Sequence, residues 1–242
     1  MNIIILTVFG LLFGSFLNVL ILRIPKNESV VFPASHCTNC DTPLKWYHNI
    51  PLFSWIFLRG KCAFCKEKIS LQYPLIELIT AILFLVCALK ADNIYIAFFD
   101  GLIFALLFAL SIIDLRYKAV PDSLSIPALV LVFAHPDFLA RVEYALLFAG
   151  GFALLRIIIS AVIKKEAMGE ADIIIAAIIG AMVGVSCGLF AIYISALFAL
   201  PAFFLVAKKG FELPFIPFLA MGLFITYLFA PQISTLLKYI YV

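Results

Sequence analysis

Residues 95–113 read YIAFFDGLIFALLFALSII, and Asp114 follows them directly. The stretch holds a single charged residue, Asp100, and is close to the roughly 20 apolar residues that cross the hydrocarbon core of a bilayer. Lipid offers no hydrogen bonds, and a helix satisfies its own backbone groups, so we expect a transmembrane helix here. Its end then carries Asp114 to the edge of the membrane.

The whole chain has the same character. It has 242 residues, of which 65% are hydrophobic and 13% charged, and its mean hydropathy is +1.17. Soluble domains are about half apolar and about a quarter charged, so the composition excludes a water-soluble enzyme and a disordered chain. A net charge of +3 gives no support for nucleic-acid binding. We predict an all-α polytopic membrane protein with about eight transmembrane helices and a small cytoplasmic zinc-binding loop. The predicted spans are 2–22, 74–91, 95–113, 122–136, 141–163, 173–187, 188–207 and 218–240.

The basic residues predict the orientation. They are concentrated in the loop 23–73, and because cytoplasmic loops are enriched in Lys and Arg, we expect this loop inside and the N-terminus in the periplasm. With eight spans, three further basic pairs also fall inside: Arg116 with Lys118, Lys164 with Lys165, and Lys208 with Lys209. The predicted organisation is a first helix at 1–22, a cytoplasmic module at 23–73 and a transmembrane core at 74–242.

The loop 23–73 contains two matched cysteine pairs. Cys37 and Cys40 form the first, Cys62 and Cys65 the second, and 21 residues separate them. Two such turns offer four thiolates to a tetrahedral zinc ion, and a reducing cytoplasm argues against two structural disulfides. Four thiolates fill every coordination position, so we predict a structural Zn²⁺ rather than a catalytic one. Redox use of the cysteines is the alternative.

Acidic residues beside apolar segments are costly and are therefore candidates for function. The candidates are Glu77, Asp114, Asp122 and Asp172. The predicted topology places Asp114 and Asp172 at the same cytoplasmic membrane edge, on different helices. Two carboxylates held together share a proton. One can then take a proton from water while the other polarises a peptide carbonyl, as an aspartic protease does.

Each carboxylate also has a structural explanation. Asp122 follows Pro121 and is typical of a helix N-cap, which we favour for it. Asp172 could be a first-turn residue stabilised by the helix dipole, and Asp114 could pair with Arg116 or Lys118.

Small residues recur every four positions after Asp172. They are Ala176, Gly180, Gly184 and Gly188, and they predict a groove that another helix can approach closely. We expect the helix 95–113 to lie there and to bring Asp114 toward Asp172. General helix packing without a bearing on catalysis is the alternative.

Six stretches of sequence, besides the cysteine pairs, resemble the motifs of one known family. They are Gly14-Ser15-Phe16-Leu17-Asn18-Val19 through Arg23-Ile24-Pro25; Asn49-Ile50-Pro51 and Ser54; Tyr73-Pro74 and Glu77; Asp114-Leu115-Arg116 through Val120-Pro121-Asp122; Ala167-Met168-Gly169-Glu170-Ala171-Asp172; and Leu213-Pro214-Phe215 with Pro217-Phe218-Leu219-Ala220 and Gly222. In this order they resemble the bacterial prepilin peptidases, or type IV leader peptidases, over nearly the whole chain.

The resemblance implies a GxGD-type aspartyl protease of the bacterial inner membrane with its active site at the cytoplasmic face. Its substrates would be type IV prepilins or type II secretion pseudopilins, and most members then methylate the new N-terminus with S-adenosylmethionine. Carried over by residue, Asp114 and Asp172 are the catalytic pair, and Cys37, Cys40, Cys62 and Cys65 are the zinc ligands. The loop 23–73 is the implied location of methyl transfer.

Two positions depart from the family pattern. Ala171 stands where the GxGD motif has its second glycine; alanine is strained there if the backbone needs positive φ and favourable if it is already helical, and we favour the helical case. Ile216 stands where a glycine is common, which affects local packing. The extra carboxylate of Glu170 could repel Asp172 or simply face water, and we favour the latter.

Other interpretations stay open at this point. Asn18 and Glu77 could line a substrate entry or form interhelical hydrogen bonds. From other functional classes, a proton-coupled transporter could use the aspartates as a proton relay, and a membrane scaffold could bind partners through its zinc loop.

Overall fold

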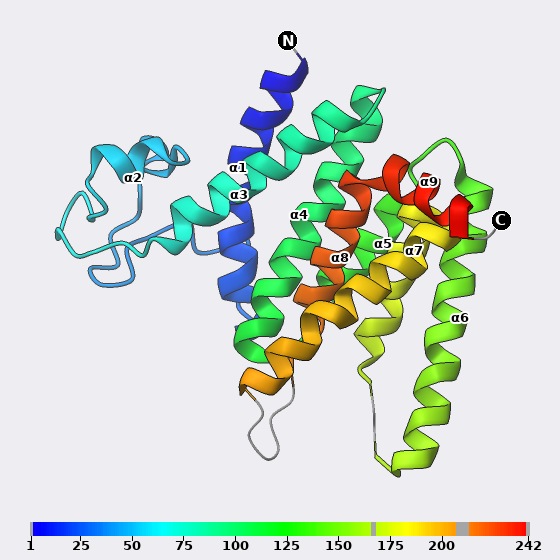
Figure 1. Cartoon of the computed structure of the whole chain (residues 1–242). Coiled ribbons are helices and arrows are strands. Elements are labelled where there is room, and N and C mark those ends of the chain that lie inside the picture. Colours follow the sequence, from blue (N-terminus) through cyan, green and yellow to red (C-terminus); the bar gives the residue numbers. More distant parts are fainter. Residues whose placement is uncertain (1, 166–167, 207–212, 241–242) are drawn as a thin grey trace. The chain divides into compact units, whose positions relative to one another are not determined.

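The computed structural model describes residues 2–165, 168–206 and 213–240 and shows helices joined by loops. Within those ranges there is no strand, only the isolated bridges His36–Pro43 and Lys61–Lys68, which confirms the all-helical class. The helices are α1 (Asn2–Arg23), α2 (Phe53–Phe57), α3 (Gln72–Lys90), α4 (Ile94–Tyr117), α5 (Asp122–Val132), α6 (Phe138–Ile163), α7 (Glu170–Val206), α8 (Ile216–Leu228) and α9 (Ala230–Ile240), with short 3₁₀ turns at Ile24–Lys26 and Trp46–Asn49 (Figure 1). Ala167, Lys208 and Lys209, on which predictions rest, lie outside the described residues.

The predicted count of eight spans is not confirmed. Among the described residues five helices are long and apolar enough to cross a membrane, or up to six if the bent pair α8 and α9 is one span. The predicted span 122–136 is the 11-residue helix α5. At about 1.5 Å per residue α5 is roughly half as long as the hydrocarbon core is thick.

The predicted spans 173–187 and 188–207 both fall in α7 as far as Val206, and residue 207 lies outside the described residues. This helix has 37 residues, which at about 1.5 Å each is nearly twice the roughly 30 Å thickness of the hydrocarbon core. Its helical backbone is interrupted at Gly184, where φ is 74° and ψ is −177°, a conformation essentially restricted to glycine. The chain turns there, and the two arms run in different directions (Figure 1).

The predicted span 218–240 is not one straight helix. α8 and α9 meet at a bend of 83°, directly after Phe229. The second arm contains Gln232, Ser234, Thr235 and Lys238, and it is the more polar of the two.

The chain divides into two compact units, Met1–Ala105 and Leu106–Val242, and α4 contributes to both. In the first unit α1 packs on α3 because glycines remove the side chains that would separate them. A Cβ at Gly14 would lie 2.7 Å from the Cα of Glu77, and one at Gly10 would lie 2.9 Å from the Cα of Ala81. The fully buried ring of Phe84 fills the space beside Gly10.

In the second unit, α6 packs into the small-residue groove of α7. A Cβ at Gly180 would lie 2.5 Å from the ring of Phe148, and one at Gly188 would lie 2.6 Å from the same ring. The prediction that 95–113 occupies these positions is therefore wrong. Periodicity reveals a face without large side chains, but the bulky partner that fits it, Phe148, lies on another helix.

We expect Gly180→Ala to lower the free energy of unfolding in detergent by about 1–3 kcal/mol, because the added methyl overpacks the ring of Phe148. Thermal unfolding of the purified protein measures this. Gly150→Ala in α6 is the matched control: nothing lies within 4 Å of a Cβ there, so alanine should be neutral or slightly stabilising. Equal effects of the two substitutions would contradict the packing argument.

Candidate functional site

Asp114 lies in the last turn of α4 and its side chain is buried, with 6% of the residue exposed. Its Oδ2 accepts a hydrogen bond of 3.2 Å from the backbone N–H of Ile216. Ile216 is the first residue of α8, and the first amides of a helix have no partner within it. The carboxylate of Asp114 therefore accepts the hydrogen bond of an amide that has no partner within its own helix, α8.

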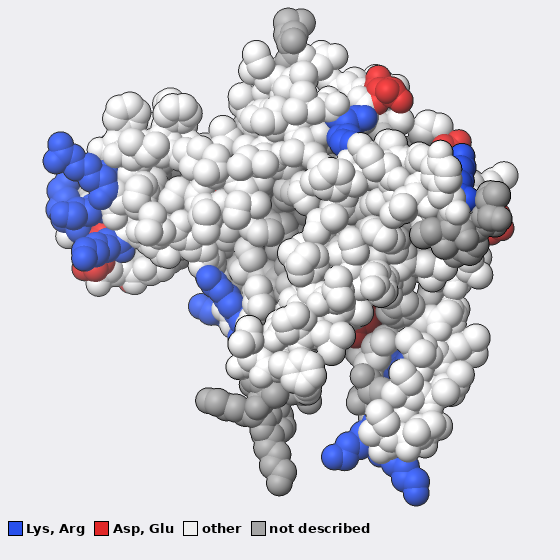
Figure 2. Space-filling view, viewed as in Figure 1, with Lys and Arg blue, Asp and Glu red and all other residues white. Residues whose placement is uncertain are grey.

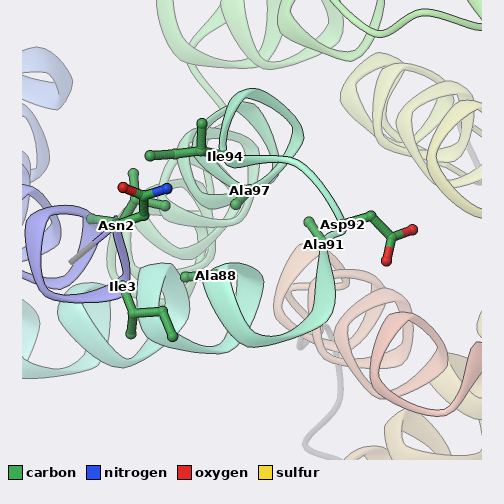
Figure 3. Close-up of a pocket in the computed structure, with 8 residues that line it drawn as sticks. Asn2, Ile3, Ala88, Ala91, Asp92, Ile94 and Ala97 are labelled. Atoms are coloured by element: carbon green, nitrogen blue, oxygen red, sulfur yellow. The ribbon is translucent and has the colours of Figure 1, made fainter.

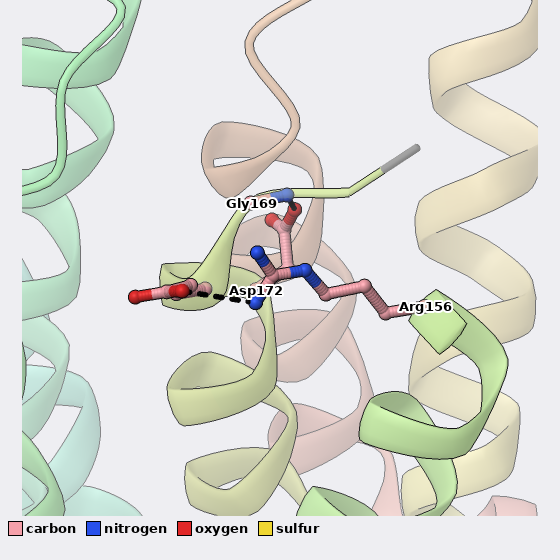
Figure 4. Close-up of polar contacts among 4 residues, drawn as sticks. Arg156, Gly169 and Asp172 are labelled. Atoms are coloured by element: carbon pink, nitrogen blue, oxygen red, sulfur yellow. Dashed lines mark hydrogen bonds and ion pairs between the residues drawn. The ribbon is translucent and has the colours of Figure 1, made fainter. Parts of the chain in front are cut away.

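Asp172 lies in the first turn of α7 and is half-buried. Its Oδ2 accepts a hydrogen bond of 3.1 Å from the backbone N–H of Gly169, just before the helix (Figure 4). This bond folds the chain before the helix back onto its first turn, and so orients the carboxylate.

The second unit contains both predicted catalytic residues, on helices that are far apart in the chain. The carboxylates of Asp114 and Asp172 lie within electrostatic range of each other. In each, a backbone amide holds Oδ2. Two carboxylates that face one site can divide the roles of general acid and general base between them.

Asp122 is placed differently from the expectation. Pro121 is at the N-cap of α5, no side chain caps this helix, and Asp122 is an exposed first-turn residue. The prediction of an Asp122 N-cap is therefore wrong by one residue, since proline adopts the extended backbone that the N-cap position requires.

The second aspartate motif adopts the expected helical backbone. α7 begins at Glu170, so Ala171 is helical and alanine is favourable there. The side chain of Glu170 is 82% exposed and faces water as expected, but it also forms an ion pair of 3.2 Å with Arg156 of α6. The sequence placed Arg156 within a span without indicating this partner.

The four cysteines of the loop form a candidate metal centre. Their Sγ atoms all lie within 4.8 Å of one another, and those of Cys37 and Cys65 are 3.8 Å apart. A tetrahedral zinc site with Zn–S bonds of about 2.3 Å has S–S edges of about 3.8 Å. The geometry and the soft thiolate donors therefore fit zinc.

The two cysteine pairs have the same backbone fold. The amide of Cys37 donates to the carbonyl of Thr42 and that of Asp41 to the carbonyl of Cys37; the amide of Cys62 donates to the carbonyl of Glu67 and that of Lys66 to the carbonyl of Cys62. Asp41 and Lys66, the residues after each pair, both have positive φ. Each turn thereby presents its two thiols from one side.

Local hydrogen bonds favour the thiolate form of Cys40 and Cys62, while burial and the neighbouring thiols of Cys62 and Cys40 raise the pKa of Cys37 to about 11. Bonds from the side chain and backbone of Thr42 lower the pKa of the Cys40 thiol to about 6, and backbone amides of Cys65 and Phe64 lower the pKa of Cys62. Deprotonated thiols are the form that binds metal. Figure 2 shows Lys and Arg side chains gathered over this module, while most of the visible surface carries no charge.

Asn18 and Glu77 form a second polar group within the first unit. The side-chain amide of Asn18 donates to the carbonyls of Gly14 and Tyr73, each at 3.2 Å, so it bonds α1 to α3. Glu77 accepts the backbone N–H of Leu52 at 2.8 Å, at a point where Leu52 has φ 61° and ψ −52°. These contacts favour the interhelical interpretation for Asn18, and for Glu77 a bond between α3 and the cysteine module.

A small cavity of about 190 Å³ lies where the N-terminus of α1 meets the end of α3 and the start of α4 (Figure 3). Asn2, Ile3 and Asp92 are among its lining residues, and neither aspartate of the pair nor any of the four cysteines is. Sites for small organic ligands usually measure about 300–1,000 Å³, so this cavity is small for such a ligand.

Which sequence signals could have revealed the backbone partners of the carboxylates? Pro217 at the start of α8 is typical of a helix N-terminus, and it indicates free amides near Ile216. Nothing in the sequence pairs those amides with Asp114 rather than with another acceptor.

Comparison with known proteins gives consistent matches. Residues 8–91 match the family described as Bacterial Peptidase A24 N-terminal domain, and residues 101–207 match the Type IV leader peptidase family. No solved structure matches.

Relatives named prepilin leader peptidase/N-methyltransferase include proteins of three bacteria. The protein of Neisseria gonorrhoeae is 34% identical, over 89% of this chain and 86% of its own, and that of Bacillus subtilis is 32% identical over 95% of each. The protein of Myxococcus xanthus is 37% identical over 73% of this chain, but the match spans only 54% of that relative. Since the relatives from Neisseria and Bacillus match over most of their length, this chain belongs to the type IV leader peptidase family.

Proposed function

We propose that the chain removes the leader peptide from type IV prepilins or type II secretion pseudopilins and then methylates the new N-terminus. Both activities stand in the names of the relatives. The observation that supports the peptidase half is that Asp114 of α4 and Asp172 of α7 lie within electrostatic range of each other in the second unit. Both aspartates lie at ends of apolar helices, and this position suits a substrate whose scissile bond directly precedes an apolar helix.

In the proposed reaction the two aspartates share the work on one water molecule. The ionised carboxylate accepts a proton as the water oxygen bonds to the scissile carbonyl carbon, and the protonated one donates to the carbonyl oxygen. The tetrahedral intermediate then collapses: the C–N bond breaks, the amine takes a proton from the carboxyl group that received it from water, and a hydroxyl of the intermediate returns its proton to the other carboxylate. The amides of Ile216 and Gly169 hold both carboxylates in place throughout.

The substrate must be extended at the cut, because a helical carbonyl is already hydrogen-bonded. Non-helical backbone follows α4 and precedes α7, at residues 118–121 and 168–169. These segments lie next in sequence to the helix ends that carry the aspartates, and they could pair with an extended peptide. The basic loop 23–73 favours a cytoplasmic side for that loop and a periplasmic N-terminus. If α3 and α4 are successive spans, the chain returns to the cytoplasmic side at Asp114.

We further propose that Cys37, Cys40, Cys62 and Cys65 hold a structural zinc ion. Four thiolates saturate the metal, and a module of about 50 residues has too little core to fold without a cross-link. The zinc would fix the two turns against each other and leave the cleavage to the carboxylates.

S-adenosylmethionine is the methyl donor that the family implies. The described cavity is small for a ligand of that size and lies away from the cysteines, so it does not fit this cofactor. We assign no residue to it and derive no methyl-transfer step.

The transporter hypothesis has no support from the comparisons, in which the matched family and relatives are peptidases.

Asp114→Asn and Asp172→Asn should each reduce leader cleavage at least about a hundredfold, since each removes one proton-transfer group. The variants should still insert into membranes. Incubation with a leader-bearing precursor and separation of the product by size measures cleavage. Asp122→Asn is the control and should retain substantial activity because Asp122 is an exposed first-turn residue. Normal cleavage by either variant of the pair would exclude that residue from catalysis.

Cys37→Ser should release the bound zinc, because three thiolates bind it more weakly than four. Elemental analysis should find one zinc per native chain and less in the variant. Limited proteolysis should cut the loop 23–73 faster, while leader cleavage should fall far less than in Asp114→Asn. Cys187→Ala, a buried cysteine outside the module, should keep its zinc. Native protein that contains no zinc would contradict this proposal.

A further inference from the structure

Arg156 is a cation within an otherwise apolar part of α6. Its neighbours Leu154, Leu155, Ile157 and Ile158 are between 41% and 65% exposed, as expected of side chains that face lipid. The side chain of Arg156 is only 23% exposed. A charge at such a place is costly without a partner, so its retention calls for a specific interaction.

One partner of Arg156 is Glu170, the first residue of α7. Arg156 Nη1 lies 3.2 Å from Glu170 Oε1, and Figure 4 shows the Arg156 side chain reaching from α6 toward the turn that carries Gly169 and Asp172. Gly169 donates its amide to Asp172, and it is bonded directly to Glu170. The ion pair therefore holds the residue beside the amide that orients the aspartate.

This contact acts on a part of α7 that the glycine packing does not reach. Gly180 and Gly188 fix α7 against Phe148 of α6, but they lie two or more turns beyond Asp172. A helix end frays unless side chains tie it down. The ion pair does so for the first turn of α7.

We propose that Arg156 is a positioning residue for peptide cleavage, which acts through Glu170 to hold the Gly169–Asp172 turn in its working geometry. The inference rests on the proposed function, because it takes Asp172 to be a member of the catalytic pair. A half-exposed ion pair adds little to overall stability, so its removal should impair the reaction more than the fold.

The test is a double-mutant cycle in steady-state cleavage of a leader-bearing precursor by the purified full-length protein. Arg156→Gln and Glu170→Gln should each lower kcat about tenfold, as expected for a misplaced catalytic group, with KM changed less than about twofold. Because the two residues act as one contact, the double variant should be no slower than either single variant. Thermal unfolding should be nearly unchanged in all three.

Two further variants make the outcome decisive. The exchange Arg156→Glu with Glu170→Arg restores the pair in reverse, so it should recover part of the kcat that Arg156→Glu alone loses. Lys165→Gln removes an exposed cation from the loop before α7, and it should leave kcat unchanged.

Three results would overturn the proposal. The first is an unchanged kcat in Arg156→Gln, and the second is a lower kcat in Arg156→Gln with an unchanged kcat in Glu170→Gln. The third is a loss of folded protein in thermal unfolding that is large enough to account for the lower kcat. These results leave the proposed function intact if Asp172→Asn is inactive. Cleavage by Asp172→Asn would instead remove the proposed function and this inference with it.

Discussion

The bilayer gives no hydrogen bonds to a charged group, and this constraint determines where such groups lie in the chain. Asp114 is at the end of α4 and bonds to the first amide of α8. Asp172 is at the start of α7 and bonds to the amide of Gly169. Glu77, within α3, bonds to a loop amide, and Arg156, within α6, bonds to Glu170. Each of these four charged side chains therefore marks a point where two segments are tied together.

Because of this constraint, the sequence predicted which side chains form the candidate site. It did not predict the backbone groups that bind them. The cost of carboxylates in apolar segments identified Asp114 and Asp172, and the spacing of thiols identified the cysteine module. Neither signal reveals a backbone partner, since every residue except proline carries the same amide. The roles of Ile216 and Gly169 follow from how α8 and α7 begin, which depends on the folded chain.

The fold was predictable to a similar degree. Long apolar runs indicated α1, α3, α4 and α6 to within a few residues. Apolar composition does not record where a helix bends, so the break at Gly184 and the bend between α8 and α9 were not predicted at their positions. The glycine groove was found, but its occupant was misassigned. The small residues of α7 show that a large side chain can fit there, but not which helix supplies it. The ring of Phe148 in α6 fills the groove.

The two units separate two kinds of chemistry. The thiols, Asn18 and Glu77 belong to the first unit, while Asp114, Asp172 and their amide partners belong to the second. The two family matches, 8–91 and 101–207, divide the chain at nearly the same place. The two described amide contacts that orient the carboxylates come from within the second unit. A metal held by the four cysteines would therefore act first on the fold of the cysteine module, since all four of its ligands belong to the first unit.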